Sequence, residues 1–214
     1  MTGALERCAD RLLAFCALVA FAPVFAVVAL AILVEDGRPI FFRQTRIGRH
    51  GRPFLLWKFR SMRNGLAGTA ITAGGDPRIT RVGAMIRRYK LDEFPQFWNV
   101  LRGDLRLVGP RPEVARYVDL TDPTWRSVLS VTPGITDLAT LVFRNEEEQL
   151  GGVEDPESYY RLVILPAKLA LNLEYLERRT IWTDVKLLFL TARFSLFPRG
   201  FEPAMIRRHV LVER

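Results

Sequence analysis

The chain has 214 residues, enough for one domain with a hydrophobic core, and only two cysteines. No CxxC pair or Cys/His cluster accompanies Cys8 and Cys16, so we expect neither a disulfide framework nor a zinc site. With two histidines in the sequence, a Ser-His-Asp or Cys-His catalytic site is poorly supported.

The net charge of +8 is distributed unevenly along the chain. The first 90 residues contain 15 Lys or Arg but only 5 Asp or Glu, and the remainder is slightly acidic. A basic first half suits nucleic acid, an anionic membrane leaflet or a phosphorylated substrate. The charge therefore predicts an anionic partner.

An uncharged apolar segment of 23 residues, Leu12–Val34, has the length of a membrane helix. Pro23 stands near its middle, where it removes a helical hydrogen bond, so we expect a break at Ala22 and Pro23. Each half of about eleven residues is too short to cross a hydrocarbon core of about 30 Å. A kinked spanning helix is the alternative; a cleaved signal peptide fits less well, because the segment is long.

Arginines flank the apolar segment on both sides: Arg7 and Arg11 precede it, and five more lie between residues 38 and 52. The positive-inside tendency then favours both ends on the cytoplasmic face. The sequence predicts a re-entrant helix-break-helix at 1–36, inserted in one leaflet. Residues 37–214 would form a cytoplasmic domain packed on the membrane surface.

The next segments predict a β-hairpin and a helix. Residues 39–62 alternate short apolar runs around a turn at 48–51, and a flexible loop is expected at 65–75. Thr80 is the predicted N-cap of the helix that follows. Three arginines lie off the apolar stripe of that helix and are expected on its solvated face: Arg81, Arg87 and Arg88.

The segment LDEFPQFWNVLRG predicts a helix with Pro95 in its first turn, ending near Arg102 before Gly103. Asp92 and Glu93 would lie at the positive end of this helix, which favours their ionised state. Two interpretations remain open for this pair of carboxylates. They cap the helix, or they serve a functional site.

The segment LVGPRPE, residues 107–113, is predicted to be irregular because of its glycine and two prolines. It would hold Arg111 on a stiff loop suited to a phosphate or carboxylate, although a plain surface turn is the alternative.

The last third of the chain is predicted to be helical. One helix is capped by Asp155, interrupted at Pro166 and continued to Arg179. Residues 183–197 are apolar nearly all round, so they are either buried or lie in a membrane interface. The fold class is therefore mainly α with a small β-hairpin, in a monotopic membrane protein with interfacial helices.

The sequence contains neither a P-loop nor a GxGxxG fingerprint after a strand, so the usual nucleotide-phosphate cradles are missing. Adjacent carboxylates near arginines permit another chemistry. One carboxylate attacks phosphorus, while Mg²⁺ and the arginines neutralise a diphosphate. Without such neutralisation an anion would have to attack an anion.

Five segments together resemble the bacterial sugar transferase family, the monotopic phosphoglycosyl transferases. They are KFRSM (58–62), DPRITRVG (76–83), LDEFPQFWNVLRGDLRLVGPRPE (91–113), TPGIT (132–136) and LPAKLALNLEYL (165–176). The resemblance implies a transferase at the bacterial inner membrane, facing the cytoplasm. It would move a phosphosugar from a UDP-sugar to polyprenol (undecaprenyl) phosphate and release UMP, which starts the synthesis of a lipid-linked glycan such as capsule, exopolysaccharide or O-antigen.

The resemblance also implies roles for individual residues. Asp92 would be the nucleophile that forms a phosphosugar-aspartyl intermediate, and Glu93 would help it to hold Mg²⁺. Arg111 would bind phosphate. Four further residues are candidates for substrate contact: Lys58, Arg60, Arg88 and Arg144.

The chain departs from the family pattern at three places. Ala22 replaces a serine common at the helix break, Asp137 and the residues after it replace a glycine-containing motif, and Arg106 replaces a common serine. Two other functions stay open: a glycosyltransferase that releases UDP, and a non-enzymatic module that binds polyanions such as lipid headgroups or nucleic acid. The first would be recognised by its product, the second by salt-sensitive binding indifferent to Asp92.

Overall fold

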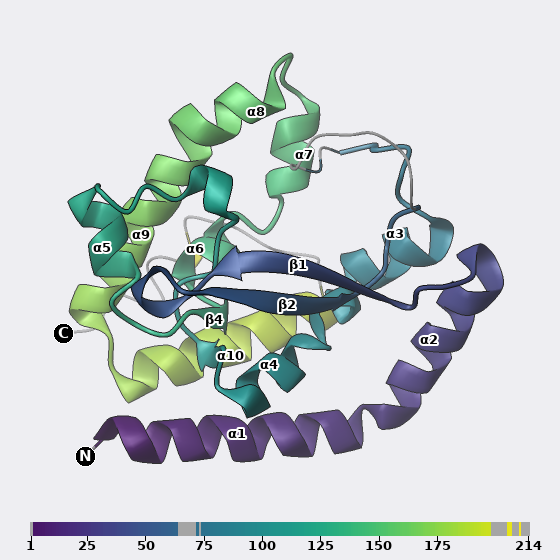
Figure 1. Ribbon diagram of the computed structural model, residues 1–214, viewed down its shortest axis with the longest axis horizontal. Coiled ribbons are helices and arrows are strands. Elements are labelled where there is room, and N and C mark those ends of the chain that lie inside the picture. Colours follow the sequence, from purple (N-terminus) through teal and green to yellow (C-terminus); the bar gives the residue numbers. More distant parts are fainter. Residues whose placement is uncertain (1, 64–71, 73, 198–204, 207–209, 211–214) are drawn as a thin grey trace.

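The computed structural model describes residues 2–63, 72, 74–197, 205–206 and 210 (Figure 1). Helices predominate, and the strands form an antiparallel hairpin and a short parallel pair. This confirms the predicted mainly helical fold with a small β-hairpin. Most of the loop predicted at 65–75 lies outside the described residues.

Two N-terminal helices, α1 (Thr2–Ala20) and α2 (Ala22–Asp36), meet at Phe21 with a bend of 60°. Pro23 lies in the first turn of α2, where a missing N–H costs little. The predicted break is thus confirmed, one residue earlier than expected. Among the described residues no single helix has the length and apolarity to cross a membrane, whereas this bent pair together does.

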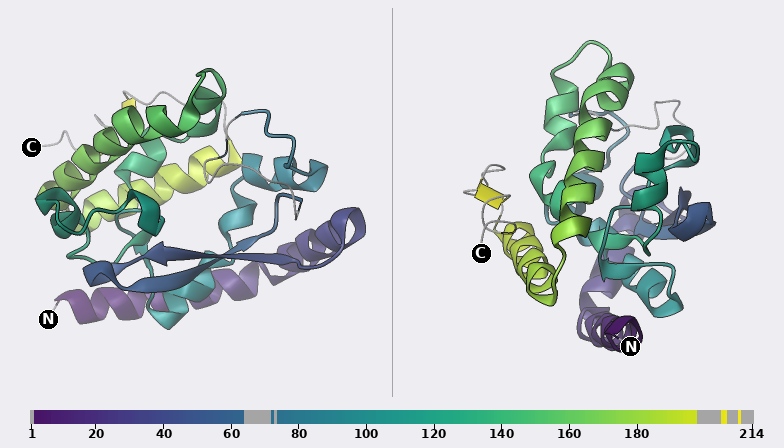
Figure 2. Two further views of the ribbon diagram at one scale, coloured as in Figure 1. Left: turned by 45° about the horizontal axis from the view of Figure 1, so that its top comes forward. Right: turned by 90° about the vertical axis from the view of Figure 1, so that its left-hand side faces the viewer.

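The hairpin is formed by β1 (Phe41–Ile47) and β2 (Pro53–Phe59), with Phe41 opposite Phe59 and a 3-10 turn at the predicted place. Figure 2 shows α1 at one end of the molecule and α8 (Pro156–Tyr159) at the other, with the hairpin between them.

Helix α4 (Gln96–Arg102) packs against α1 on one side and β2 on the other. Asn99 of α4 is fully buried. Its side-chain amide hydrogen-bonds the main chain of β2 at the edge where a neighbouring strand would otherwise pair. Asn99 Oδ1 accepts from the Trp57 N–H (3.1 Å), and Nδ2 donates to the Leu55 carbonyl (2.7 Å). The helix ends before Gly103, as predicted, and Gly103 adopts the left-handed conformation.

The parallel pair joins β3 (Arg106–Val108) to β4 (Gly134–Thr136). The prediction that residues 107–113 are irregular was therefore wrong for Leu107 and Val108, and β4 was not predicted. Each strand has only three residues, too few to show an alternating pattern. The irregular part begins at Gly109, whose N–H still donates to the Thr136 carbonyl (3.0 Å).

Helix α9 (Leu165–Arg178) follows α8 through a π-helical segment, Tyr160–Ile164. The predicted interruption at Pro166 was wrong, because the chain stays helical through it: Pro166 lies in the first turn of α9, and the departure from α geometry is the π-helical segment before it. Asp155 caps α8, and Thr80 caps α3, both as predicted. The remaining α-helices lie along the chain as follows: α3 (Arg81–Arg88), α5 (Pro123–Val128), α6 (Leu138–Val142), α7 (Glu146–Gly151) and α10 (Ile181–Leu196).

The main hydrophobic core lies where α1, β2, α4, α6, α9 and α10 meet. Helix α10 contributes one face: Leu187 and Phe194 are fully buried, whereas Phe189 is 66% exposed. The sequence left two alternatives for residues 183–197, burial or a membrane interface. Burial is correct for one side of α10 only.

Two glycines allow the loops after β3 and before β4 to touch. A Cβ added to Gly134 would lie 2.6 Å from the Gly109 carbonyl oxygen, closer than any van der Waals contact. We therefore expect Gly134→Ala to lower the free energy of unfolding by about 2–3 kcal/mol, measured by denaturant titration.

Gly152→Ala is the matched control, because its Cβ would lie 3.7 Å from the nearest oxygen. It should change the free energy of unfolding by less than about 0.5 kcal/mol. Equal effects of the two substitutions would contradict the close approach.

Candidate active site

Asp92 and Glu93 lie in a 3-10 turn, Leu91–Glu93, between α3 and α4. Lys90 enters this turn in the left-handed conformation (φ 57°), which redirects the chain inward. Asp92 is only 4% exposed. Neither carboxylate accepts a capping hydrogen bond from α4, whose N-cap is Pro95. The capping interpretation is therefore wrong.

One oxygen of Glu93 joins two cations from different parts of the chain. Glu93 Oε1 lies 3.1 Å from Lys58 Nζ of β2 and 2.5 Å from Arg111 Nη2. Burial alone would raise the pKa of Glu93, but the charges of Arg111 and Lys58 outweigh it and hold this pKa well below the usual range. Glu93 is therefore ionised and already neutralised by its partners.

Asp92 has the opposite environment. Its Oδ1 is buried and has no hydrogen-bond partner among the described residues. Burial raises the pKa of Asp92, and the negative charge of Glu93 adds to that effect. The charges of Lys58, Lys90 and Arg87 oppose it. Two adjacent carboxylates thus differ: one is paired, and the other is free to react.

Arg111 is held at three points. Its main-chain N–H donates to Asp137 Oδ2 (2.8 Å). In the guanidinium, Nη1 donates to the Ile135 carbonyl (3.0 Å) and Nη2 to Glu93. Asp137 also caps α6 by accepting from the Thr140 N–H (2.5 Å). The predicted stiff loop therefore exists, and its rigidity comes as much from Asp137 as from the prolines.

The structure separates the other predicted substrate contacts. Arg60 is buried away from the pair and binds Asp36 Oδ2 (3.1 Å) and the carbonyls of Asp36 and Gly37 at the end of α2. Arg88 is exposed and stacks on Tyr89. Arg144 lies within the electrostatic reach of Glu93; burial lowers the pKa of Arg144, and Glu93 opposes this.

Three residues near the pair were missed by the sequence reasoning: Arg87, Lys90 and Asp137. Arg87 was expected on a solvated face, which was wrong; it is half-buried, pairs with Glu147 and donates to Ser61 Oγ (3.2 Å). A signal for Arg87 and Lys90 did exist, because both lie within five residues of Asp92. No local pattern indicated Asp137, since its contact with Arg111 spans 26 residues.

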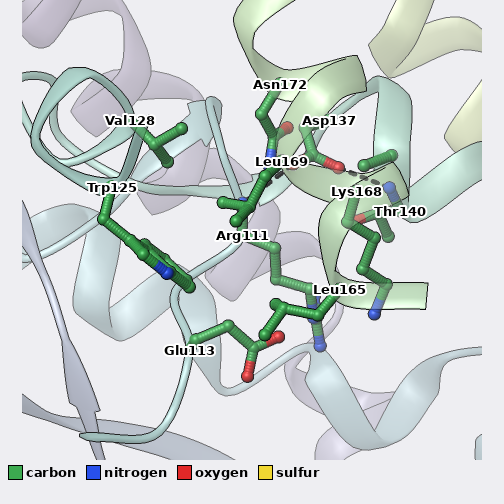
Figure 3. Close-up of a pocket in the computed structure, with 11 residues that line it drawn as sticks. Arg111, Glu113, Trp125, Val128, Asp137, Thr140, Leu165, Lys168, Leu169 and Asn172 are labelled. Carbon is green, nitrogen blue, oxygen red and sulfur yellow. Dashed lines mark hydrogen bonds between the residues drawn. The ribbon is translucent and has the colours of Figure 1, made fainter. Parts of the chain in front are cut away.

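A cavity lies behind Arg111, between α5, α6 and α9, as Figure 3 shows. It has room for about one water molecule. Thr140 Oγ1 and Asn172 Oδ1 are both buried without a hydrogen-bond partner among the described residues, and both residues line the cavity. The cavity is too small for a nucleotide sugar.

The fold and the site define a class: a mainly helical domain, joined to a bent apolar helix pair, with a buried carboxylate pair among cations. The model of one family, described as bacterial sugar transferase, matches residues 1–198. The chain belongs to this family.

The chain is also similar to named proteins. A UDP-glucose:undecaprenyl-phosphate glucose-1-phosphate transferase of Escherichia coli (strain K12) is 36% identical over 198 residues, covering 87% of this chain and 39% of the relative. A UDP-N-acetylgalactosamine-undecaprenyl-phosphate N-acetylgalactosaminephosphotransferase of Aeromonas hydrophila is 35% identical over 197 residues, covering 90% and 44%.

A shorter relative, the uncharacterized sugar transferase EpsL of Bacillus subtilis (strain 168), is 35% identical over 183 residues, covering 86% of this chain and 81% of the relative. The chain spans about two fifths of the length of the Escherichia coli and Aeromonas proteins.

The opposed environments of the two carboxylates predict an unusual pH for the protonation of Asp92. Asp92 should protonate at a higher pH than an ordinary aspartate as the pH falls, and Lys58→Met should move that transition to still higher pH, because it removes a cation that stabilises the ionised form. Nuclear magnetic resonance of ¹³Cγ-aspartate-labelled protein follows it, with Asp92→Asn to assign the signal.

Arg60→Met is the control, because Arg60 binds Asp36 instead of the carboxylate pair. It should leave the Asp92 transition unchanged. An Asp92 signal that titrates like an exposed aspartate in the unmodified protein would contradict the description of this site.

Proposed function

We propose that this protein transfers a phosphosugar from a UDP-sugar to polyprenol phosphate and releases UMP, at the start of lipid-linked glycan synthesis. The names of two relatives describe this type of transfer. The observation that carries the proposal is the buried, unpartnered Asp92 beside a Glu93 that is already neutralised.

In the first half-reaction, an Asp92 carboxylate oxygen attacks the phosphorus that bears the sugar. The new oxygen–phosphorus bond forms as the bond from that phosphorus to the bridging oxygen breaks, and UMP leaves with the electron pair. The ionised form of the carboxylate is the nucleophile, and this form needs no base. Burial increases its basicity, which suits a nucleophile, while Lys58, Lys90 and Arg87 offset the repulsion between anions.

In the second half-reaction, an oxygen of polyprenol phosphate attacks the same phosphorus, and its bond to Asp92 breaks. The carboxylate returns to its initial state, and the product is a polyprenol diphosphate sugar. Arg111 is held beside the carboxylate pair by Asp137 and by Glu93 itself. Its guanidinium would hold a phosphate in the fork geometry that arginine provides.

Mg²⁺ fits the residues present. Among the described residues no three His, Cys, Asp or Glu side chains form a metal cage. Mg²⁺ in phosphoryl-transfer sites usually binds one or two carboxylates and completes its shell with water and substrate phosphate. Asp92 and Glu93 would hold the ion, because Asp92 Oδ1 has no hydrogen-bond partner among the described residues. When bound, it would neutralise charge on the diphosphate.

The bend between α1 and α2 supports re-entrant insertion of this helix pair into one leaflet of the membrane. The leaflet would be the cytoplasmic one of the bacterial inner membrane. Large apolar side chains point outward on both helices, among them Leu12, Phe15, Val27 and Leu30. Contiguous exposed apolar surface of this kind suits a lipid environment.

Helix α10 extends this apolar surface. Arg179, just before α10, binds Glu6 of α1 (3.1 Å), so the helices begin side by side. Ile181 and Trp182 there are 67% and 74% exposed. We assign the exposed side of α10 to the membrane interface, where tryptophan is favoured.

Asp92→Asn should lower UMP release from a UDP-sugar at least about 10³-fold, because an amide is a poor nucleophile. The variant should fold and bind membranes, since Asp92 Oδ1 makes no hydrogen bond that would be lost. Asp119→Asn, at an exposed turn, is the control and should retain full activity. Full activity of Asp92→Asn, or release of UDP instead of UMP, would overturn the mechanism.

The topology predicts the same accessibility at both ends of the helix pair. In a chain with Cys8 and Cys16 replaced by serine, Gly3→Cys and Arg38→Cys should each react with an impermeant maleimide only when the cytoplasmic face is exposed. Labelling of the two positions from opposite faces of sealed vesicles would show a spanning helix.

A further inference from the structure

The mechanism above gives no reason for the π-helical segment Tyr160–Ile164. Here the Leu165 N–H donates to the Tyr160 carbonyl, five residues back, where an α-helix would use a spacing of four. Single π-helical turns are rare and occur frequently at functional sites. Tyr160, the first residue of the segment, is only 3% exposed, and its hydroxyl donates to Glu113 Oε1 (2.5 Å). The π-helical turn thus carries a buried contact with the segment that contains Arg111.

Glu113, the last residue of the segment LVGPRPE, has a partner for each carboxylate oxygen. Oε1 accepts from the Tyr160 hydroxyl, and Oε2 lies 3.3 Å from Arg46 Nη1 of β1. Burial raises the pKa of Tyr160, and the negative charge of Glu113 adds to that effect. The phenol therefore stays protonated, so that it can donate its hydrogen bond to Glu113.

Further hydrogen bonds fix the main chain directly after Arg111. Arg46 Nη1 donates to the Pro112 carbonyl (3.1 Å), and the Ile47 N–H donates to the Glu113 carbonyl (2.8 Å). Residues 112 and 113 are therefore attached to the end of β1. The Tyr160 hydroxyl then holds the Glu113 side chain from the opposite end of the sequence motif's contacts, in the helical part of the domain.

The position of the Arg111 side chain depends on this attachment. Its guanidinium donates to the Ile135 carbonyl (3.0 Å) and to Glu93 (2.5 Å) at the same time, which requires a fixed main chain. Only Pro112 separates Arg111 from Glu113, so a shift of Glu113 would move Arg111 as well. Both residues also line the small cavity of Figure 3, which leaves space for such a shift.

We propose that Tyr160 is a positioning residue for the phosphate-binding arginine. Its hydroxyl fixes the carboxylate of Glu113, and Glu113 together with Arg46 fixes the loop that presents Arg111 to the substrate. This proposal rests on the proposed function. It also gives the π-helical turn a purpose, because that turn carries the hydroxyl that meets Glu113.

The test is Tyr160→Phe, which removes the hydroxyl and keeps the ring. The rate of the first UMP turnover, measured with UDP-glucose or UDP-N-acetylgalactosamine and without polyprenol phosphate, should fall about 10-fold, because displaced positioning groups cost up to about 10²-fold. Nuclear magnetic resonance of ¹⁵N-arginine-labelled protein reports the position of Arg111 directly. Its Nε signal, assigned by its loss in Arg111→Lys, should shift in Tyr160→Phe.

Tyr175→Phe is the matched control, because the fully buried Tyr175 also donates its hydroxyl to a carboxylate, Asp184 Oδ1 (2.5 Å). Each substitution removes one buried hydrogen bond, so both should lower the melting temperature to a similar extent. Only Tyr160→Phe should slow UMP release and shift the Arg111 signal. An unchanged rate in Tyr160→Phe, a slower rate with an unmoved Arg111 signal, or an equal rate loss in the control would overturn the proposal.

If Tyr160→Phe fails to fold, Arg46→Lys tests the same attachment. Lysine keeps the positive charge but lacks the fork that binds Pro112 and Glu113 together, so the rate must fall and the Arg111 signal must shift here too. Absence of any UMP turnover in the unmodified protein would instead overturn the proposed function. The shift of the Arg111 signal would still be expected in that case, so the two failures are distinguishable.

Discussion

The structure of the site depends on one shared oxygen, Glu93 Oε1, which binds both Lys58 and Arg111. This oxygen links β2 of the hairpin to the loop after β3, because it forms ion pairs with a cation from each of them. Asp92, the preceding residue, is left buried and without a hydrogen-bond partner for its Oδ1 among the described residues. A buried carboxylate without a partner is unfavourable for folding, and its retention is most readily explained by chemistry.

The rest of the fold serves to keep this arrangement rigid. Gly109 and Gly134 bring two loops into backbone contact, and Asp137 uses one carboxylate to fix both α6 and the main chain of Arg111. Asn99 holds α4 against β2 from the other side. None of these residues belongs to the carboxylate pair. Each of them fixes the position of a segment that carries a residue of the site.

The helix pair is fixed to the domain at both ends. Glu35, near the end of α2, accepts from the N–H groups of Arg81 and Val82 (both 2.8 Å) and so caps α3. At the other end, Arg106 of β3 binds Glu6 (2.7 Å) and Asp10 (2.7 Å) of α1. Arg106, a departure from the family pattern, therefore has a structural explanation.

Sequence patterns predicted the local features well, because these depend on neighbouring residues. The hairpin, the break near Pro23 and the caps at Thr80, Asp155 and Gly103 were all confirmed. The motifs also brought Glu93, Lys58 and Arg111 together correctly. Patterns failed where distant segments decide the outcome: the β3–β4 pair, the burial of Arg87 by Glu147, and the use of Arg60 to hold the end of α2.

The account stands on Asp92 forming a covalent bond to phosphorus. The most direct measurement is tandem mass spectrometry of peptides from protein that has reacted with a UDP-sugar, without polyprenol phosphate, and has been quenched in acid. We predict a phosphosugar on Asp92 and on no other residue. An adduct on a different side chain, or steady UMP release with no adduct at any stage, would contradict the account.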